Sequence, residues 1–241
     1  MVGARTLLQQ AKHTRLGRSL YSLGHSINKL ISMNSSAQYG EDKIIDNYFM
    51  STWGLNYKGT VLDIGANDGI TYSNSYQFIK RGWKADLVEP SPKAFERLEQ
   101  MYLGRAGVNL FNYAIGKFGH VTLYESGHLV TSDDIALVST LLPEEIKKWE
   151  PYNTQFETVQ VHSITFDYFK RLSGRQQWDF ISIDAEGMDL EILKQIDLTA
   201  VGCKCLCIEY NGVQKEEFVA YAKSHGMFLH WINNVNLIFI R

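Results

Sequence analysis

The chain has little cysteine, little net charge and no long apolar run, and each shortage excludes a class of protein. Its 241 residues include three cysteines and carry a formal net charge of −2. No apolar run approaches the roughly 20 residues of a membrane-spanning helix. Residues 1–30 also lack the continuous apolar segment of a signal peptide. So small a net charge indicates no nucleic-acid partner. We therefore expect a cytoplasmic protein that binds no nucleic acid.

All three cysteines fall in one short segment, Cys203-Lys204-Cys205-Leu206-Cys207. In a strand such alternate side chains share one face, too far apart along it for a disulfide. No second group of metal ligands stands nearby in the sequence, so a zinc site is not expected. We interpret the three as buried, reduced thiols, as is usual in the cytosol.

The chain does have enough apolar residues for one sizeable domain, with 45% hydrophobic and 12% aromatic residues. Predicted strands and helices alternate, which favours an α/β fold: a Rossmann-like, mostly parallel, doubly wound sheet. Its strands are predicted at about 60–64, 85–89, 109–115, 179–184 and 204–210. Residues 228–232 and 236–240 predict a closing antiparallel hairpin at the C-terminus.

The alternation is interrupted in the middle of the chain. Residues 120–124 and 159–164 predict two extra strands, and residues 125–158 are polar and irregular apart from a short helical piece. So long an irregular stretch in a compact domain is usually functional or disordered. We interpret it as a lid over a substrate, in which any single residue is more often solvated than catalytic. Its polar residues include His128, Asp133, Asp134, Ser139 and Thr140.

The first segment differs in charge from the rest. Residues 1–40 contain five basic residues and no acidic one, so they carry +5 and the remainder −7, since the total is −2. Leucines and isoleucines recur there at helical spacing. We predict a basic amphipathic helical arm over residues 1–36, before a domain of residues 37–241. The arm either packs on the domain, lies on a membrane surface, contacts a partner domain, links to another domain or is a transit peptide.

Residues 61–69 place an apolar strand before a glycine-containing turn. A second apolar strand ends at Glu89, which follows Asp63 by 26 residues. An acidic residue there can accept hydrogen bonds from a ribose diol, and Gly65 and Gly69 let the backbone approach a ligand. Asn67 stands where a dinucleotide fingerprint has glycine, so no phosphate cradle is expected. An acidic Asp63 suits a cationic ligand, which favours S-adenosylmethionine as cofactor.

Several motifs, in this order and spacing, resemble the FkbM family of S-adenosylmethionine-dependent methyltransferases over residues 37–241. They are Gln38-Tyr39-Gly40-Glu41-Asp42, Asp63-Ile64-Gly65-Ala66-Asn67-Asp68-Gly69, Ser73-Asn74-Ser75, Gly82-Trp83, Glu89-Pro90-Ser91-Pro92, Asn112-Tyr113-Ala114-Ile115-Gly116 and Ile183-Asp184-Ala185-Glu186-Gly187. The resemblance implies a class I methyltransferase that usually methylates hydroxyls of sugars or secondary metabolites. His162 departs from the family, which often has an apolar residue there. We interpret His162 as strand surface first and as a substrate or base residue second.

Cofactor contacts are predicted from these motifs and from placement at strand ends. The predicted residues are Gln38, Tyr39, Asp63, Gly65, Ala66, Asn67, Gly69, Ser73, Asn74, Glu89, Pro90, Ser91, Asn112, Ala114 and Asp184. Gln38 and Tyr39 match a family motif and are expected to close over the methionine moiety, unless they only begin a helix. Asn112 and Ala114 sit at the end of the third predicted strand, where the adenine usually lies in class I methyltransferases.

Acidic groups are predicted at the carboxyl ends of two neighbouring strands, which face the cofactor crevice in an open sheet. Asp184 and Glu186 follow the strand at 179–184, and Glu209 and Asn211 end the strand at 204–210. In one mechanism Asp184, Glu186 or Glu209 acts as general base or orients the acceptor. In the other, Asp184, Glu209 and Asn211 hold Mg²⁺, by analogy with catechol-type O-methyltransferases. A helix cap is the plainer alternative for Asp184.

The sequence therefore predicts a methyltransferase that acts on a hydroxyl of a sugar or glycan, such as a polysaccharide or a glycosylated metabolite. An acceptor among non-sugar secondary metabolites is one alternative. Another is a catalytically silent domain of the same fold, although such a domain has no need to keep Asp63 and Glu89. An oxidoreductase is disfavoured by the missing phosphate fingerprint.

Overall fold

The computed structural model of the protein describes residues 35–127, 136–152 and 154–241. Almost all of the predicted basic arm lies outside these residues, as do His128, Asp133 and Asp134 of the predicted lid. Within them, no helix is both long enough and apolar enough to cross a membrane.

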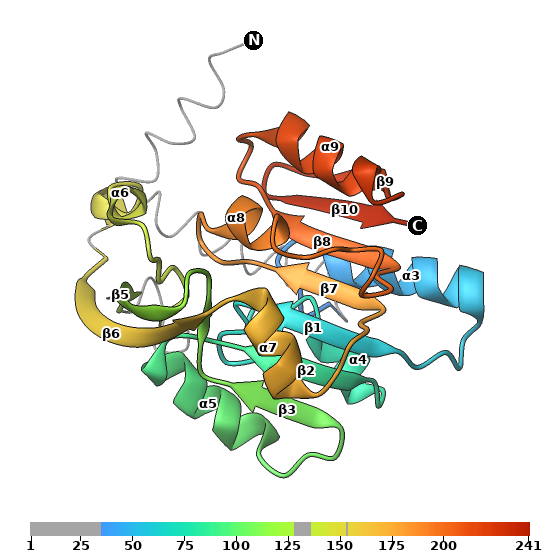
Figure 1. Ribbon diagram of the computed structural model, residues 1–241, viewed down its shortest axis with the longest axis horizontal. Helices are drawn as coiled ribbons and strands as arrows, with labels where there is room; N and C mark the ends of the chain where they lie inside the picture. The colour runs from blue at the N-terminus through green and yellow to red at the C-terminus, as the bar shows by residue number, and fades with distance from the viewer. Residues whose placement is uncertain (1–34, 128–135, 153) are drawn as a thin grey trace, which may run out of the picture.

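Seven strands form the central sheet, in the order β3-β2-β1-β7-β8-β10-β9 (Figure 1). They are β1 (Thr60–Ile64), β2 (Lys84–Val88), β3 (Val108–Phe111), β7 (Phe180–Ile183), β8 (Cys205–Glu209), β9 (Phe228–Ile232) and β10 (Asn236–Ile240). The pairs from β3 to β8 are parallel, whereas β10 is antiparallel to β8 and β9. The order in which successive strands are added reverses between β1 and β7. This is the class I methyltransferase topology, and the predicted fold and closing hairpin are confirmed.

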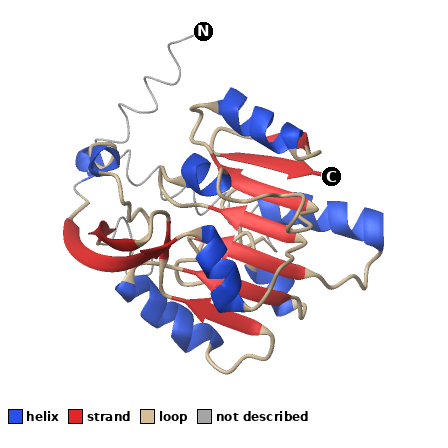
Figure 2. Ribbon diagram, in the orientation of Figure 1, coloured by secondary structure: helices blue, strands red, loops and turns tan. Residues whose placement is uncertain are grey.

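Helices cover both faces of the sheet, which is why its central strands are continuously apolar (Figures 1 and 2). They are α3 (Glu41–Trp53), α4 (Tyr76–Lys80), α5 (Pro92–Tyr102), α7 (Phe166–Ser173), α8 (Asp189–Leu193) and α9 (Lys215–Ser224). One core cluster joins the sheet to α3, α4 and α5 through Phe49, Phe78 and Leu98. The other joins it to α7, α8 and α9 and includes Phe169 and Phe218.

The predicted third strand, 109–115, is wrong, because it is two strands in different sheets. β3 ends at Phe111, and β4 (Ala114–Ile115) belongs to a three-stranded sheet ordered β4-β6-β5. Between them Asn112 turns the chain: its amide donates to the carbonyl oxygens of Glu89 at 2.8 Å and Pro90 at 3.2 Å. The extra strands, β5 (Gly119–Ser126) and β6 (Phe156–Ile164), form an antiparallel pair longer than predicted. With α6 (Pro143–Ile146), they lie beside the carboxyl ends of the parallel strands (Figure 1).

The three cysteines are buried and unpaired, as expected, but they do not share one face. Cys205 and Cys207 pack in the cluster on the α3 side of the sheet, whereas Cys203 precedes β8 and packs in the opposite cluster. Burial raises the pKa of the Cys203 thiol to about 12. All three thiols are therefore unreactive side chains of the core.

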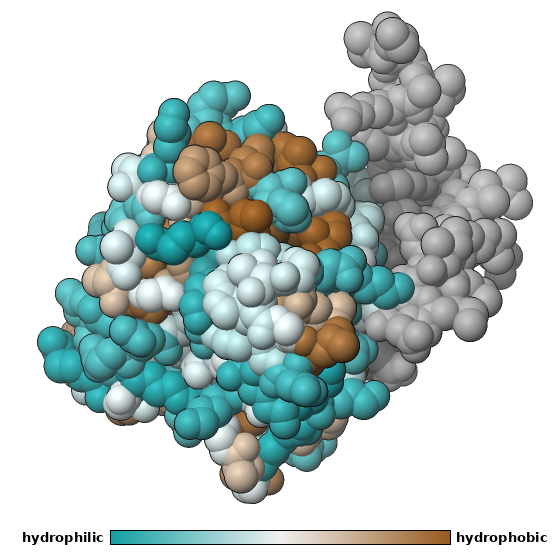
Figure 3. Space-filling view, turned by 90° about the vertical axis from the view of Figure 1, so that its right-hand side faces the viewer, coloured by the Kyte–Doolittle hydropathy of each residue, from teal (hydrophilic) through white to brown (hydrophobic). Residues whose placement is uncertain are grey.

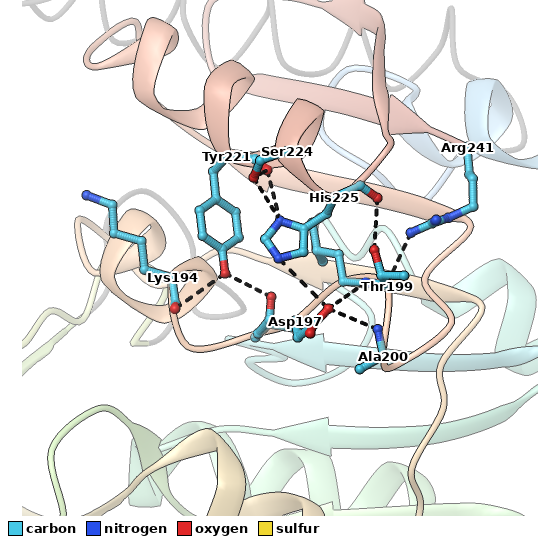
Figure 4. A network of polar contacts seen from close by, with 10 residues as sticks. Lys194, Asp197, Thr199, Ala200, Tyr221, Ser224, His225 and Arg241 are labelled. Atoms are coloured by element: carbon cyan, nitrogen blue, oxygen red, sulfur yellow. Dashed lines mark hydrogen bonds and ion pairs between the residues drawn. The ribbon is translucent and has the colours of Figure 1, made fainter.

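At the amino-end edge of the sheet, a polar network joins α9 to the loop that leads into β8 (Figure 4). Tyr221 donates its hydroxyl hydrogen to the carbonyl oxygen of Ile196 at 3.1 Å. Its ring lies 4.5 Å from that of His225, which also faces the Asp197 carboxylate at 3.8 Å. These contacts fix the last turn of α9 and have no part in the carboxyl-end crevice.

The edge strand β9 leaves apolar side chains in solvent. Phe228, Leu229 and Ile232 are all exposed. Figure 3, which views the molecule from the right-hand side of Figure 1, shows a mostly hydrophilic face with hydrophobic patches. An exposed apolar edge strand can pair with other chains. We therefore expect β9 to favour self-association at high protein concentration.

Candidate active site

A pocket opens at the carboxyl ends of β1, β2 and β7, where the strand order reverses. Together with the solvent at its open mouth, it encloses about 880 Å³. The far wall is formed by residues of the β5–β6 region. The predicted site residues that line the pocket are Asp63, Gly65, Ala66, Asn67, Ser73, Asn74, Glu89, Pro90, Ala114, Asp184 and Glu186.

The turn after β1 also needs its glycines for contacts inside the protein. A Cβ atom on Gly65 would lie 1.7 Å from the carbonyl oxygen of Asp184, and the φ angle of Gly65 is +87°. A Cβ atom on Gly69 would lie 2.4 Å from the ring of Tyr102. Gly65 thus lets β1 approach the end of β7, and Gly69 lets the turn pack on α5. Gly69 does not line the pocket.

Glu89 directly follows the last residue of β2 and is buried beside the turn after β1. Its Oε2 atom accepts a hydrogen bond from the N–H of Asn67 at 2.9 Å, and its Oε1 atom from the N–H of Ser91 at 2.7 Å. Burial raises the pKa of Glu89 to about 7, although the two backbone donors act in the opposite direction. Each oxygen retains a lone pair. The carboxylate is therefore rigidly held and can still accept hydrogen bonds from a ligand.

Ser91 serves the helix rather than the pocket. Its hydroxyl donates to Glu125 at 2.6 Å and accepts from the N–H of Ala94 at 3.1 Å, so it caps α5. The buried Glu125 also pairs with Lys93 at 3.0 Å. These contacts join β5 to α5 next to Glu89. Ser91, for which a cofactor contact was predicted, does not line the pocket.

Asp63 lies in β1 among small polar side chains. Its Oδ2 atom accepts from the Ser75 hydroxyl at 2.5 Å. Burial raises the pKa of Asp63 to about 6, and hydrogen bonds from Ser75 and Ser182 oppose the increase. Asn74 donates to the Ser182 hydroxyl at 3.3 Å. Sequence reasoning missed Ser182, although a polar residue two places before Asp184 in an apolar strand must share its face.

Asp184, Glu186 and Glu209 are brought together at the edge of the pocket. Each offers a carboxylate oxygen within 4.8 Å of the other two. Burial raises the pKa of all three groups, and neighbouring carboxylates, Asp189 among them, raise it further. The pKa of Asp184 reaches about 8. The sequence-based grouping of these three acids is thus geometrically sound.

The turn between β7 and α8 is held by Asp189, not by Asp184. Asp189 accepts from the N–H of Ala185 at 2.8 Å and of Gly187 at 3.0 Å. Glu186 adopts a left-handed φ of 46°, which is uncommon for a residue with a side chain. Capping therefore does not account for Asp184, and its carboxylate faces the pocket with that of Glu186.

Asn211 occupies a different position from the one predicted. It is exposed and hydrogen-bonds the Glu209 side chain, which lowers the pKa of Glu209. Among the described carboxylates, those of Asp184, Glu186 and Glu209 converge, and Asn211 lies beside Glu209 at the edge of this group.

Gln38, Tyr39 and Asn112 do not line the pocket. Tyr39 is 47% exposed, and its N–H donates to Glu41 at 2.8 Å, immediately before α3. The plainer alternative, a helix start, describes this segment in the structure. Asn112 holds the turn between β3 and β4.

The β5–β6 region contributes wall residues that the sequence did not single out. They are Leu123, Ala136, Leu137 and Leu141, together with the predicted Ser139. Thr140 donates its hydroxyl hydrogen to the carbonyl oxygen of Glu186 at 2.8 Å, which joins the two walls. His162 is exposed on β6, with its ring 4.2 Å from that of His120, and belongs to the strand surface.

The strand order and the pocket define a class I methyltransferase. The sequence matches the model of the methyltransferase FkbM domain over residues 63–236. The chain therefore belongs to the FkbM family of methyltransferases, as its motifs predicted.

Several solved methyltransferases are similar in structure. The FkbM methyltransferase of Methylobacillus flagellatus KT is 12% identical with a TM-score of 0.46, covering 85% of this chain and 51% of that one. The TehB-like S-adenosylmethionine-dependent methyltransferase of Corynebacterium glutamicum is 11% identical with a TM-score of 0.43, covering 93% and 98%. Aeropyrum pernix fibrillarin with bound S-adenosylmethionine is 10% identical with a TM-score of 0.43, covering 83% and 74%. This chain spans about half the length of the FkbM structure. No curated protein matches the chain.

The pocket fits the methyl donor of this family, S-adenosylmethionine. Asp63, Glu89 and Asp184 all line the pocket, and carboxyl groups can accept hydrogen bonds from ribose hydroxyls and from an ammonium group. The turn after β1 offers an acid rather than a phosphate cradle. The acidic acceptors of the pocket therefore suit a cationic nucleoside.

Proposed function

We propose that this chain transfers a methyl group from S-adenosylmethionine to a hydroxyl of a sugar or glycan. The observation that carries the proposal is that Asp184 and Glu186 line the same pocket as Tyr72 and Tyr113. Carboxylates accept hydrogen bonds from hydroxyl groups, and tyrosine rings offer flat faces to the C–H groups of a sugar ring.

The cofactor supplies an activated methyl group with a neutral leaving group. The protein must hold the acceptor oxygen in line and receive its proton. Asp184 or Glu186 would do both, because a positioned base contributes typically about 10²–10⁴-fold. The alternative that these acids act through Mg²⁺ keeps the same residues in the same place.

A second acceptor class is a hydroxylated secondary metabolite without a sugar. Leu123, Leu137, Leu141 and Met188 give part of the wall an apolar character, which favours this candidate. Both acceptors present a hydroxyl to the same two carboxylates.

The direct test is methyl transfer from isotope-labelled S-adenosylmethionine to a panel of glycans, glycosylated metabolites and sugar-free hydroxyl compounds. We expect labelled methyl on oxygen of a sugar, located by mass spectrometry of the product. Label only on sugar-free hydroxyls would select the second candidate. Label only on nitrogen or carbon would contradict both acceptor classes.

Cofactor affinity should weaken as pH falls through about 7. The pKa of Glu89 is raised to about 7, so below that pH the acid is protonated and loses its charge-assisted bonds to ribose. Above that pH the Glu89 carboxylate is ionised, so Glu89 adds no further change in affinity. Calorimetry with S-adenosylhomocysteine should show a loss of about tenfold from pH 8 to pH 6, because only about one acid in ten is ionised one pH unit below its pKa.

Glu89→Gln is the matched variant for this prediction. It should bind weakly at both pH values and show no step near pH 7. A wild-type step that survives unchanged in Glu89→Gln would assign the pH dependence to another group, with Asp63 the next to replace.

A further inference from the structure

One oxygen of the carboxylate cluster is buried without a partner. Glu209 is 6% exposed, and its Oε2 atom has no hydrogen-bond partner among the described residues. A buried charged oxygen without a partner is destabilising unless a positive charge or a hydrogen-bond donor compensates it. Glu209 points into the same small space as Asp184 and Glu186.

Among the residues that the structure describes, no ion pair joins a basic side chain to Asp184, Glu186 or Glu209. The ammonium of Lys148 is in an ion pair with Glu145 instead. Asp189, which accepts hydrogen bonds from the N–H groups of Ala185 and Gly187, adds a further carboxylate to the same turn. Like charges so close cannot all be ionised unless a cation joins them.

We propose that Asp184, Glu186 and Glu209 form a binding site for a divalent cation of the magnesium or manganese type. The three residues differ from the set predicted from the sequence, because Glu186 replaces Asn211. The role of the cation in holding the acceptor hydroxyl rests on the proposed function, whereas its binding does not.

The geometry suits a hard cation. Mg²⁺ and Mn²⁺ prefer carboxylate oxygens, and Mg²⁺ keeps several of its water ligands. Oxygens within 4.8 Å of one another can share one ion after small side-chain movements, since ligands on opposite sides of Mg²⁺ lie about 4 Å apart. Three protein oxygens leave positions for water and for an acceptor hydroxyl. Asp184 and Glu186 line the pocket, so those open positions face it.

The test is a Mn²⁺ titration of the full chain followed by electron paramagnetic resonance, without cofactor or acceptor. We expect one saturable Mn²⁺ per chain, displaced by Mg²⁺, and a rise in melting temperature as the ion binds. Glu209→Gln should weaken Mn²⁺ at least tenfold and lose the thermal shift.

Glu125→Gln is the matched control, because Glu125 is also a buried carboxylate but bonds to Ser91 and Lys93 instead. It should bind Mn²⁺ as the wild type does. If Glu209→Gln does not fold, Glu186→Gln, on a partly buried turn residue, gives the same comparison.

Two results would overturn the proposal. One is no saturable Mn²⁺ binding up to about 10 mM, ten times the dissociation constants of the weakest protein calcium sites. The other is wild-type Mn²⁺ affinity in both Glu209→Gln and Glu186→Gln. Protons alone would then neutralise the cluster. Calorimetry with S-adenosylhomocysteine on the same samples separates the two proposals. Cofactor binding without Mn²⁺ removes only the cation site, and Mn²⁺ binding without the cofactor removes only the proposed function.

Discussion

Replacing Gly65 with alanine should destabilise the fold severely, by about 4 kcal/mol or more, through overpacking and backbone strain together. The added Cβ atom would lie 1.7 Å from the carbonyl oxygen of Asp184, with φ at +87°. Because that contact is with backbone, no rotamer change can relieve it. The ends of β1 and β7 would have to separate, and the pocket opens between them. Urea unfolding measures the loss, and any folded fraction should bind S-adenosylhomocysteine poorly.

Gly40→Ala is the control for the backbone conformation alone. Gly40 has a φ of +85°, yet a Cβ atom there would meet nothing within 4 Å. Its variant should lose only the roughly 1–2 kcal/mol of a left-handed residue with a side chain. Equal losses in the two variants would mean that the approach of β1 to β7 does not require the glycine.

Asp184→Asn should lower methyl transfer by about 10²–10⁴-fold, the range for loss of a positioned base. The acid lines the pocket and shares the carboxylate cluster, so loss of its charge disables either a base or a cation ligand. The fold should not suffer: burial raises the pKa of Asp184 to about 8, so ionisation of the wild type is unfavourable in the folded state as pH rises towards 8. The variant should be at least as stable there.

Asp167→Asn is the matched surface control. Asp167 lies on α7, with its side chain 73% exposed in an ion pair with Lys170. Rate and melting temperature should both match those of the wild type. Full activity in Asp184→Asn, with S-adenosylhomocysteine still bound, would leave substrate positioning as the whole mechanism.

The core of the site could be predicted because parallel strands end at one edge of a sheet. Asp63, Glu89 and Asp184 each stand at or near the end of an apolar strand, and these three strands lie side by side. Their spacing along the chain was therefore enough to predict that the three acids lie at one pocket.

Other parts of the site depend on contacts between segments distant in sequence. The need for Gly65 comes from the carbonyl oxygen of Asp184, and that for Gly69 from Tyr102. Neither neighbour can be read from the local motif. Likewise, the third strand was predicted as one because nothing in residues 109–115 shows that Asn112 bonds back to Glu89 and Pro90.

Turn geometry places the Glu186 carboxylate with those of Asp184 and Glu209, whereas Asn211 follows the end of β8. Asp189 holds the turn after β7, and Glu186 takes a left-handed φ of 46°. Residues two apart on an ideal strand would have shared a face, which was the basis for pairing Glu209 with Asn211. However, Asn211 lies beyond the last residue of β8 with its own φ of 48°.

Calorimetry with S-adenosylhomocysteine, NAD and NADP on wild type and Glu89→Ala tests the central claim most directly. The account predicts one S-adenosylhomocysteine per chain, no binding of either dinucleotide, and a loss of about 1.5–3 kcal/mol in Glu89→Ala from missing charge-assisted bonds to ribose. Binding of NAD or NADP without S-adenosylhomocysteine would contradict the account, and equal affinity in Glu89→Ala would remove Glu89 from the cofactor site.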